Sequence, residues 1–146
     1  MEHHLVLRVV SKLIIPPILL FGLYVQFHGD HGAGGGFQAG VIIAVAFILY
    51  GLVFGIPRLL RVLPWRFIRA SMAAGVLLYA GTGAASMLMG ADYLDYAPFG
   101  ATPVEGQHLG ILLVELGVGI TVASVMLAIF IAFAARLPSQ IKDEEW

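Results

Sequence analysis

The sequence predicts an all-α membrane protein with four transmembrane helices and both termini in the cytoplasm. The chain has 146 residues, of which 60% are hydrophobic and only 12% are charged, and its mean hydropathy is +0.93. A soluble domain is nearer half apolar and a quarter charged, so the composition excludes that class as well as disorder. The absence of cysteine excludes disulfides and thiolate chemistry, and a net charge of −1 gives no case for nucleic-acid binding.

Four apolar segments reach the length of about 20 residues that a helix needs to cross the hydrocarbon core. The first counts as a span if Arg8 and Lys12 extend to the headgroups. It also has the basic start and apolar run of a signal peptide, but no small-residue cleavage site follows Phe27, so we expect it to remain as a span. We expect a single membrane domain over 1–146 with spans at about 5–27, 36–55, 70–90 and 109–135.

The basic residues predict the orientation. All eight lie before or within the start of the first span, between the second and third spans, or after the fourth. Because positive residues stay cytoplasmic, both termini and the segment 56–69 are expected inside. This inner segment should be a short basic elbow with Pro57 and Pro64 as breakers. The two outer loops carry acids and no Lys or Arg, namely Asp30, Asp92, Asp95 and Glu105.

Glycines at four-residue spacing predict close helix packing, because small residues let helix backbones approach in lipid. Such pairs bracket the second span and open the fourth. They could pack helices within this chain or against other subunits, and we favour other subunits because the small residues lie on several faces. The candidate docking residues are Gly34, Gly35, Gly36, Phe37, Gly40, Gly51, Gly55, Gly106, Gly110, Gly117 and Gly119.

The segment 27–40 is the most unusual stretch, with six glycines in fourteen residues. Glycine permits positive φ and close backbone approach. The segment could be a tight turn, or its N–H groups before a helix could hold an anion. It follows no strand and has no Walker lysine, so nucleotide binding is a poor fit.

Three histidines lie on the outer side of the membrane in this topology. His28 and His31 are three residues apart, and His108 opens the fourth span, with Asp30 nearby. Such residues can bind zinc, but nothing in the sequence brings them together. We therefore predict no metal site and treat them as solvated residues at the interface.

Glu115 is the only charged residue within 109–135. It lies six residues beyond Leu109, about 9 Å along a helix, and His108 lies seven residues before it on nearly the same face. A carboxylate in the membrane is costly and is a functional candidate by default. We predict a water-filled route to it from His28, Asp30, His31 and His108. The alternative is a structural hydrogen bond to Thr82 or Ser86.

Two stretches resemble the B subunit of multisubunit Na+/H+ antiporters of the Mrp or Mnh type. Residues 28–42, HGDHGAGGGFQAGVI, are similar to the glycine-rich signature of that family, with Ala33 where the family commonly has proline. Residues 106–122 resemble the last helix of the family. The resemblance covers nearly the whole chain, and the glycine-rich signature is its most specific part.

The resemblance implies an accessory subunit of a cation/proton antiporter complex in a bacterial or archaeal cytoplasmic membrane. Its partners would be subunits of the A, C, D, E, F and G types, with Na+ and H+ as the transported ions, and it would have no cofactor and no enzymatic activity of its own. Two alternatives remain. One is the equivalent subunit of a redox-driven or hydrogenase complex that resembles respiratory complex I. The other is a small membrane enzyme with Glu115 and His108 as acid and base.

Overall fold

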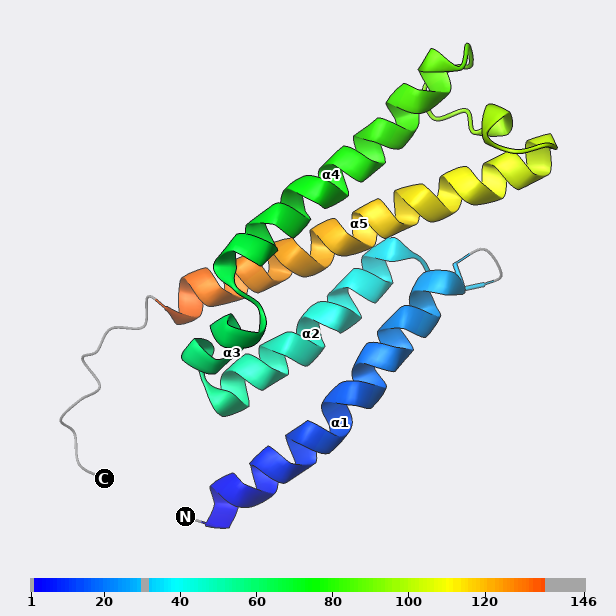
Figure 1. Ribbon diagram of the computed structural model, residues 1–146. Helices are drawn as coiled ribbons and strands as arrows, with labels where there is room; N and C mark the ends of the chain where they lie inside the picture. Colours follow the sequence, from blue (N-terminus) through cyan, green and yellow to red (C-terminus); the bar gives the residue numbers. More distant parts are fainter. Residues whose placement is uncertain (1, 30–31, 136–146) are drawn as a thin grey trace.

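The computed structural model describes residues 2–29 and 32–135. Over these residues the chain is helical apart from turns and loops (Figure 1). Four helices are long and apolar enough to cross a membrane, which confirms the four predicted spans. The elements are α1 (Glu2–Phe27), α2 (Gly36–Phe54), α3 (Ile56–Val62), α4 (Trp65–Leu88), the 3-10 turn η1 (Ala97–Phe99) and α5 (Pro103–Ala134).

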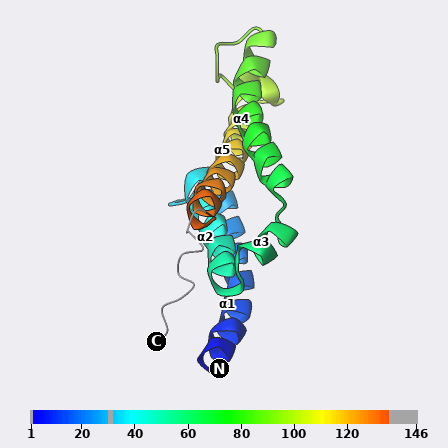
Figure 2. The same ribbon diagram turned by 90° about the vertical axis from the view of Figure 1, so that its left-hand side faces the viewer.

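The four long helices form two hairpins, α1–α2 and α4–α5, which meet where α2 packs against α5. Helix α5 packs against α4 and α2, and α2 packs in turn against α1. Figure 2 shows that the helices lie in one thin layer, with α3 to one side. The start of α1, helix α3 and the end of α5 lie at the same end of this layer (Figure 1). An even number of spans places both termini on the same side of the membrane. The end of the layer that carries α3 is the predicted cytoplasmic end.

The two hairpins are staggered along α5. Helix α2 runs parallel to α5, with Gly36 against the backbone of Glu115 and Gly51 against Phe130. The outer end of α2 therefore lies level with Glu115. Residues 103–114 of α5 continue beyond this level for about 18 Å at 1.5 Å per residue, and Figure 1 shows the α4–α5 hairpin extending past the end of α1 and α2.

The inner segment 56–69 is more ordered than the predicted elbow. Pro57 lies in the first turn of α3, and Pro64 is the residue before α4. Proline is tolerated at a helix start because the first N–H groups have no partner within the helix. Both prolines therefore begin helices here, and the third span begins at Trp65 rather than at residue 70. The fourth span likewise begins at Pro103 rather than at residue 109.

Local interactions explain the outer ends of α4 and α5. Thr102 caps α5 by accepting a hydrogen bond from the N–H of Glu105, at 3.3 Å, in the spacing of a capping box. The buried hydroxyl of Ser86 lies 2.8 Å from the carbonyl of Gly83 and 3.0 Å from that of Asp92, and it accepts the N–H of Leu94 at 3.1 Å. These bonds fix the loop between α4 and α5.

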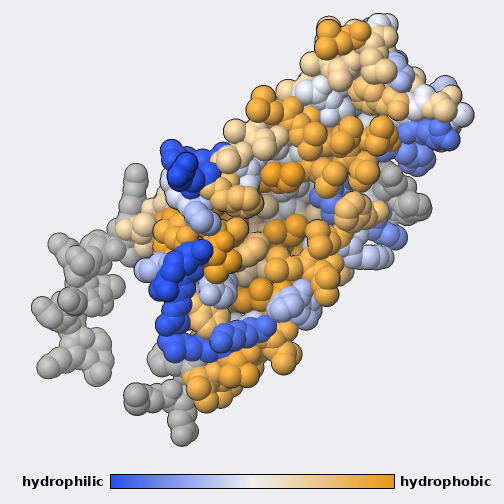
Figure 3. Space-filling view, in the orientation of Figure 1, coloured by the Kyte–Doolittle hydropathy of each residue, from blue (hydrophilic) through white to orange (hydrophobic). Residues whose placement is uncertain are grey.

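Most large apolar side chains face outward. A small buried cluster of Leu59, Ile68 and Ile131 joins α3, α4 and α5 at the inner end. Elsewhere many leucines, valines and phenylalanines are exposed, and Figure 3 shows hydrophobic surface over most of the layer, with hydrophilic surface gathered toward its two ends. This distribution is typical of helices whose surroundings are lipid or other membrane subunits rather than water.

Candidate functional site

The glycine-rich turn between α1 and α2 lies directly against the side chain of Glu115. A Cβ atom added at Gly29 would lie 2.7 Å from both carboxylate oxygens, and one added at Gly35 would lie 3.0 Å from Oε1. Glu115 is half-buried. The carboxylate and the turn are eighty positions apart in sequence and meet because α2 begins level with the middle of α5.

Backbone bonds fold the turn onto the end of α1. The N–H of Gly35 donates to the carbonyl of Val25 at 3.1 Å, and the N–H of Gly32 donates to the carbonyl of His28 at 3.2 Å. Gly35 has a φ of 118°, in a region that only glycine adopts readily. A Cβ at Gly34 would lie 2.7 Å from the Val25 carbonyl, so this turn requires its glycines for steric reasons.

The position of the carboxylate at the start of α2 has an electrostatic consequence. Helix α2 begins at Gly36, and its N-cap residue is Gly35, which has no side chain to cap the helix. The positive end of a helix dipole stabilises a nearby negative charge. The sequence left two functions open for the glycine-rich segment, a tight turn or an anion-holding segment. The structure shows a turn, and the carboxylate of Glu115 lies against it.

Gln26 is a buried polar side chain near the half-buried Glu115, and the sequence patterns did not single it out. It is only 4% exposed, and its Oε1 lies over Gly119, one turn along α5 from Glu115. Its Nε2 is buried and has no hydrogen-bond partner among the described residues. The available signal was a lone amide near the end of an apolar span.

The histidines that we predicted for the route to Glu115 lie at different depths. His28 precedes Gly29, is half-buried and stacks on Tyr24 with ring centroids 5.0 Å apart. His108 is exposed on α5, about 10.5 Å further out than Glu115 at 1.5 Å per residue. Asp30 and His31 lie outside the described residues. Among residues 2–29 and 32–135, no group of three His, Cys, Asp or Glu is placed to hold a metal ion.

The hydroxyls that we considered as structural partners of Glu115 bond elsewhere. Thr82 donates to the carbonyl of Leu78 in its own helix at 2.7 Å, and Ser86 serves the outer loop. Both lie on α4, whereas the carboxylate faces the turn between α1 and α2. The alternative of a hydrogen bond to these two hydroxyls is therefore not what the structure shows, and the carboxylate packs against glycine backbone.

The candidate docking glycines pack helices within this chain. Gly36 and Gly40 meet the backbone of α5, Gly51 meets Leu59 and Phe130, and Gly117 meets α4 at Gly75 and Tyr79. Gly119 meets Gln26 and Gly36, whereas Gly106 and Gly110 receive the outer loop at Tyr96 and Ala97. Gly34 and Gly35 belong to the turn, Gly55 has a φ of 91° between α2 and α3, and Phe37 is exposed. The contacts of these helix glycines therefore match packing within the chain, which was the alternative to the subunit contacts that we favoured.

Comparison with known proteins gives a consistent family. Residues 6–128 match the family model described as a domain related to the MnhB subunit of Na+/H+ antiporter. Relatives described as antiporter subunit mnhB2 from Staphylococcus aureus strains Newman, JH1 and Mu3 are each 37% identical over 136 residues. These alignments cover 91% of this chain and 96% of each relative.

Proposed function

Because the chain belongs to the MnhB family of Na+/H+ antiporter subunits, we propose that it acts as an accessory membrane subunit of such a complex and that Glu115 lies on an outer-side proton path. The family membership carries the first part of this proposal. The contact between the Glu115 carboxylate and Gly29 carries the second. The proposed setting is a bacterial or archaeal cytoplasmic membrane, with A, C, D, E, F and G type subunits as partners and Na+ and H+ as the ions.

The chain's architecture supports a component better than a complete pump. It is a layer one helix thick in which α5 contacts both neighbours, and many large apolar side chains are exposed. A single carboxylate lies in the apolar part of α5. The MnhB relationship favours the antiporter over a redox-driven complex or a small membrane enzyme.

The surroundings of Glu115 support a role in proton transfer. The outer loops contain acids and no Lys or Arg, so the outer surface attracts cations. The carboxylate lies near the start of α2, the positive end of that helix dipole, and His28 lies next to the turn that covers it. In this proposal, protons reach Glu115 from the outer side past His28 and the glycine-rich turn, and the carboxylate passes them on within the complex.

Co-purification tests the assignment of this chain to an antiporter complex. An affinity tag on this chain should recover the other antiporter subunits in mild detergent, and deletion of the chain should abolish Na+-dependent proton exchange in inside-out vesicles. Expression of the intact chain from a plasmid should restore that exchange. Full exchange in the deletion strain, or recovery of the tagged chain alone under conditions that keep the other subunits together, would contradict the proposal.

A further inference from the structure

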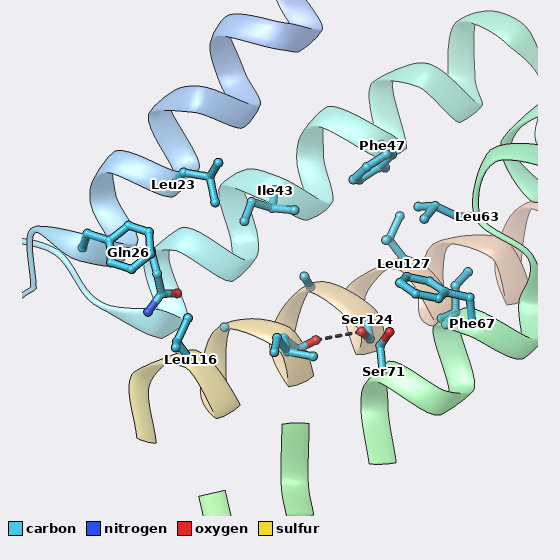
Figure 4. A pocket seen from close by; sticks show the side chains of 15 residues that line it. Leu23, Gln26, Ile43, Phe47, Leu63, Phe67, Ser71, Leu116, Ser124 and Leu127 are labelled. Atoms are coloured by element: carbon cyan, nitrogen blue, oxygen red, sulfur yellow. Dashed lines mark hydrogen bonds between the residues drawn. The ribbon is translucent and has the colours of Figure 1, made fainter. Parts of the chain in front are cut away.

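We propose that a groove on one face of the α4–α5 pair is the docking site for a transmembrane helix of another subunit of the complex. The inference rests on the proposed function for the existence of such subunits. Helices α4 and α2 lie on different sides of α5 (Figure 1), and side chains of these three helices and of α1 line a cavity over α5. Figure 4 shows this cavity of about 270 Å³, the inner half of the groove, with Leu23 and Gln26 of α1 at one end and Phe67 of α4 near the other.

The groove continues along the outer half of the same two helices. A second cavity there is lined by Leu78, Ala85, Leu109 and Leu113, with Phe99 of η1 at its outer end. Residues three or four apart share a helix face, and one set of lining residues follows that spacing on each helix. The residues that follow it are Phe67, Ser71, Leu78 and Ala85 on α4, and Leu109, Leu113, Leu116, Ile120 and Leu127 on α5; Ile68, Leu77 and Thr82 of α4 line the margins.

The length of the groove matches an element that spans the membrane. Leu127 lies eighteen positions after Leu109 on α5, about 27 Å along the helix at 1.5 Å per residue. The hydrocarbon core of a bilayer is about 30 Å thick. A lipid chain reaches through only one leaflet, whereas a transmembrane helix reaches through both.

The α4 wall of the groove permits close approach of another helix. Ala74 and Gly81 lie on this face and are exposed, and a Cβ atom added at Gly81 would meet nothing within 4 Å. Small residues at exposed positions let a second helix approach to backbone contact in lipid. The glycines of α2 and α5 differ, because their space is already filled by this chain.

Gln26 distinguishes a polypeptide from a lipid tail as the occupant. Its side chain lies at one end of the inner cavity, beside Leu116 (Figure 4). It is 4% exposed, and its Nε2 has no partner in the described part of the chain. An unpaired amide in an apolar environment is costly. A helix with a polar side chain at this depth supplies an acceptor after a small rotation of the amide, and an acyl chain supplies none.

Neighbouring alanines give a matched test. Ala73 and Ala74 are both exposed on α4. Ala74 is one turn from two lining residues, Ser71 and Leu78, whereas Ala73 is one turn from Leu77 alone. The chain has no cysteine, so Ala74→Cys and Ala73→Cys can each carry a photoreactive thiol reagent within the purified complex. We expect the Ala74 probe to form an adduct with one other subunit and the Ala73 probe to label lipid. Equal labelling of a subunit by both probes, or lipid adducts alone from Ala74, would overturn the proposal.

Bulky substitution at the same pair gives a second measurement. Ala74→Phe should reduce the recovered complex by about tenfold, whereas Ala73→Phe should leave recovery unchanged. Both variants should keep the thermal stability of the isolated chain, because neither site is buried. Equal effects on recovery would contradict docking in the groove. If the unmodified complex is intact but the Ala74 probe forms no adduct, the docking groove is contradicted and the proposed function is not. If this chain is recovered without any complex, the proposed function is contradicted.

Discussion

The carboxylate of Glu115 lies against the backbone of Gly29, so that a single added methyl group at Gly29 would come within 2.7 Å of both carboxylate oxygens. This relationship joins the most unusual sequence segment of the chain to its one carboxylate in the apolar part of α5. Two glycines of the segment 27–40 also differ in what they contact. Gly29 faces the mobile end of a side chain, whereas Gly36 faces the main chain of α5.

Substitution at Gly29 should affect transport more than folding. In Gly29→Ala the new methyl group can displace the carboxylate without moving a helix, so the free energy of unfolding should change by less than about 1 kcal/mol. Sodium-dependent proton exchange in inside-out vesicles should fall several-fold. Ala73→Val is the control, because Ala73 is exposed on α4 and lies outside the proposed groove. Equal exchange in both variants would contradict the importance of this contact.

Substitution at Gly36 should affect folding first. A Cβ atom at Gly36 would overlap the carbonyl of Glu115, and overpacking of this kind costs about 1–3 kcal/mol. Gly36→Ala should therefore lower the thermal stability of the purified chain even without its partners. Thermal unfolding of the isolated chain in detergent measures this effect, with Gly81→Ala as the reference because its added Cβ meets nothing within 4 Å in this chain. A Gly36→Ala chain as stable as the reference would show that α2 and α5 are not packed as described.

The outer loop should be accessible only from outside the cell. Ala101 is exposed in the loop before α5, whereas Tyr96 in the same loop is 8% exposed, so Ala101→Cys is the better labelling site. An impermeant thiol reagent should react with Ala101→Cys in whole cells and with Val62→Cys only in inside-out vesicles. The reverse pattern would overturn the topology that the basic residues predict.

Alkaline pH should loosen the outer loop through Tyr96. Burial raises the pKa of this phenol, and negative charge on Tyr79 and Tyr93 adds to the effect. The folded state therefore favours the neutral phenol, and this stabilisation is complete below the ordinary value of 10.0 and is lost as pH rises through the raised pKa. Thermal stability measured from pH 8 to above pH 10 should fall more steeply in the unmodified chain than in Tyr96→Phe. Parallel curves would contradict this role.

The sequence was sufficient to predict the spans, because each depends only on local hydropathy and length. Helix starts were less accurate, since Pro57 and Pro64 can begin a helix as readily as end one. The contact between Glu115 and Gly29 was not predictable in detail, because it depends on the stagger of α2 along α5. Gln26 was missed because one amide scarcely changes the hydropathy of α1, and its importance arises from tertiary burial.

The central claim is that Glu115 exchanges protons, and Glu115→Gln tests it most directly. Glutamine keeps the shape of the side chain but cannot take up and release a proton, so the complex should assemble normally. Sodium-dependent proton exchange in inside-out vesicles, followed with a pH-sensitive dye at several pH values, should be lowered or shifted in its pH profile. Glu115→Ala should also reduce stability, because it removes the side chain that the turn covers. Normal exchange with an unchanged pH profile in Glu115→Gln would contradict the account and leave Glu115 with a structural role alone.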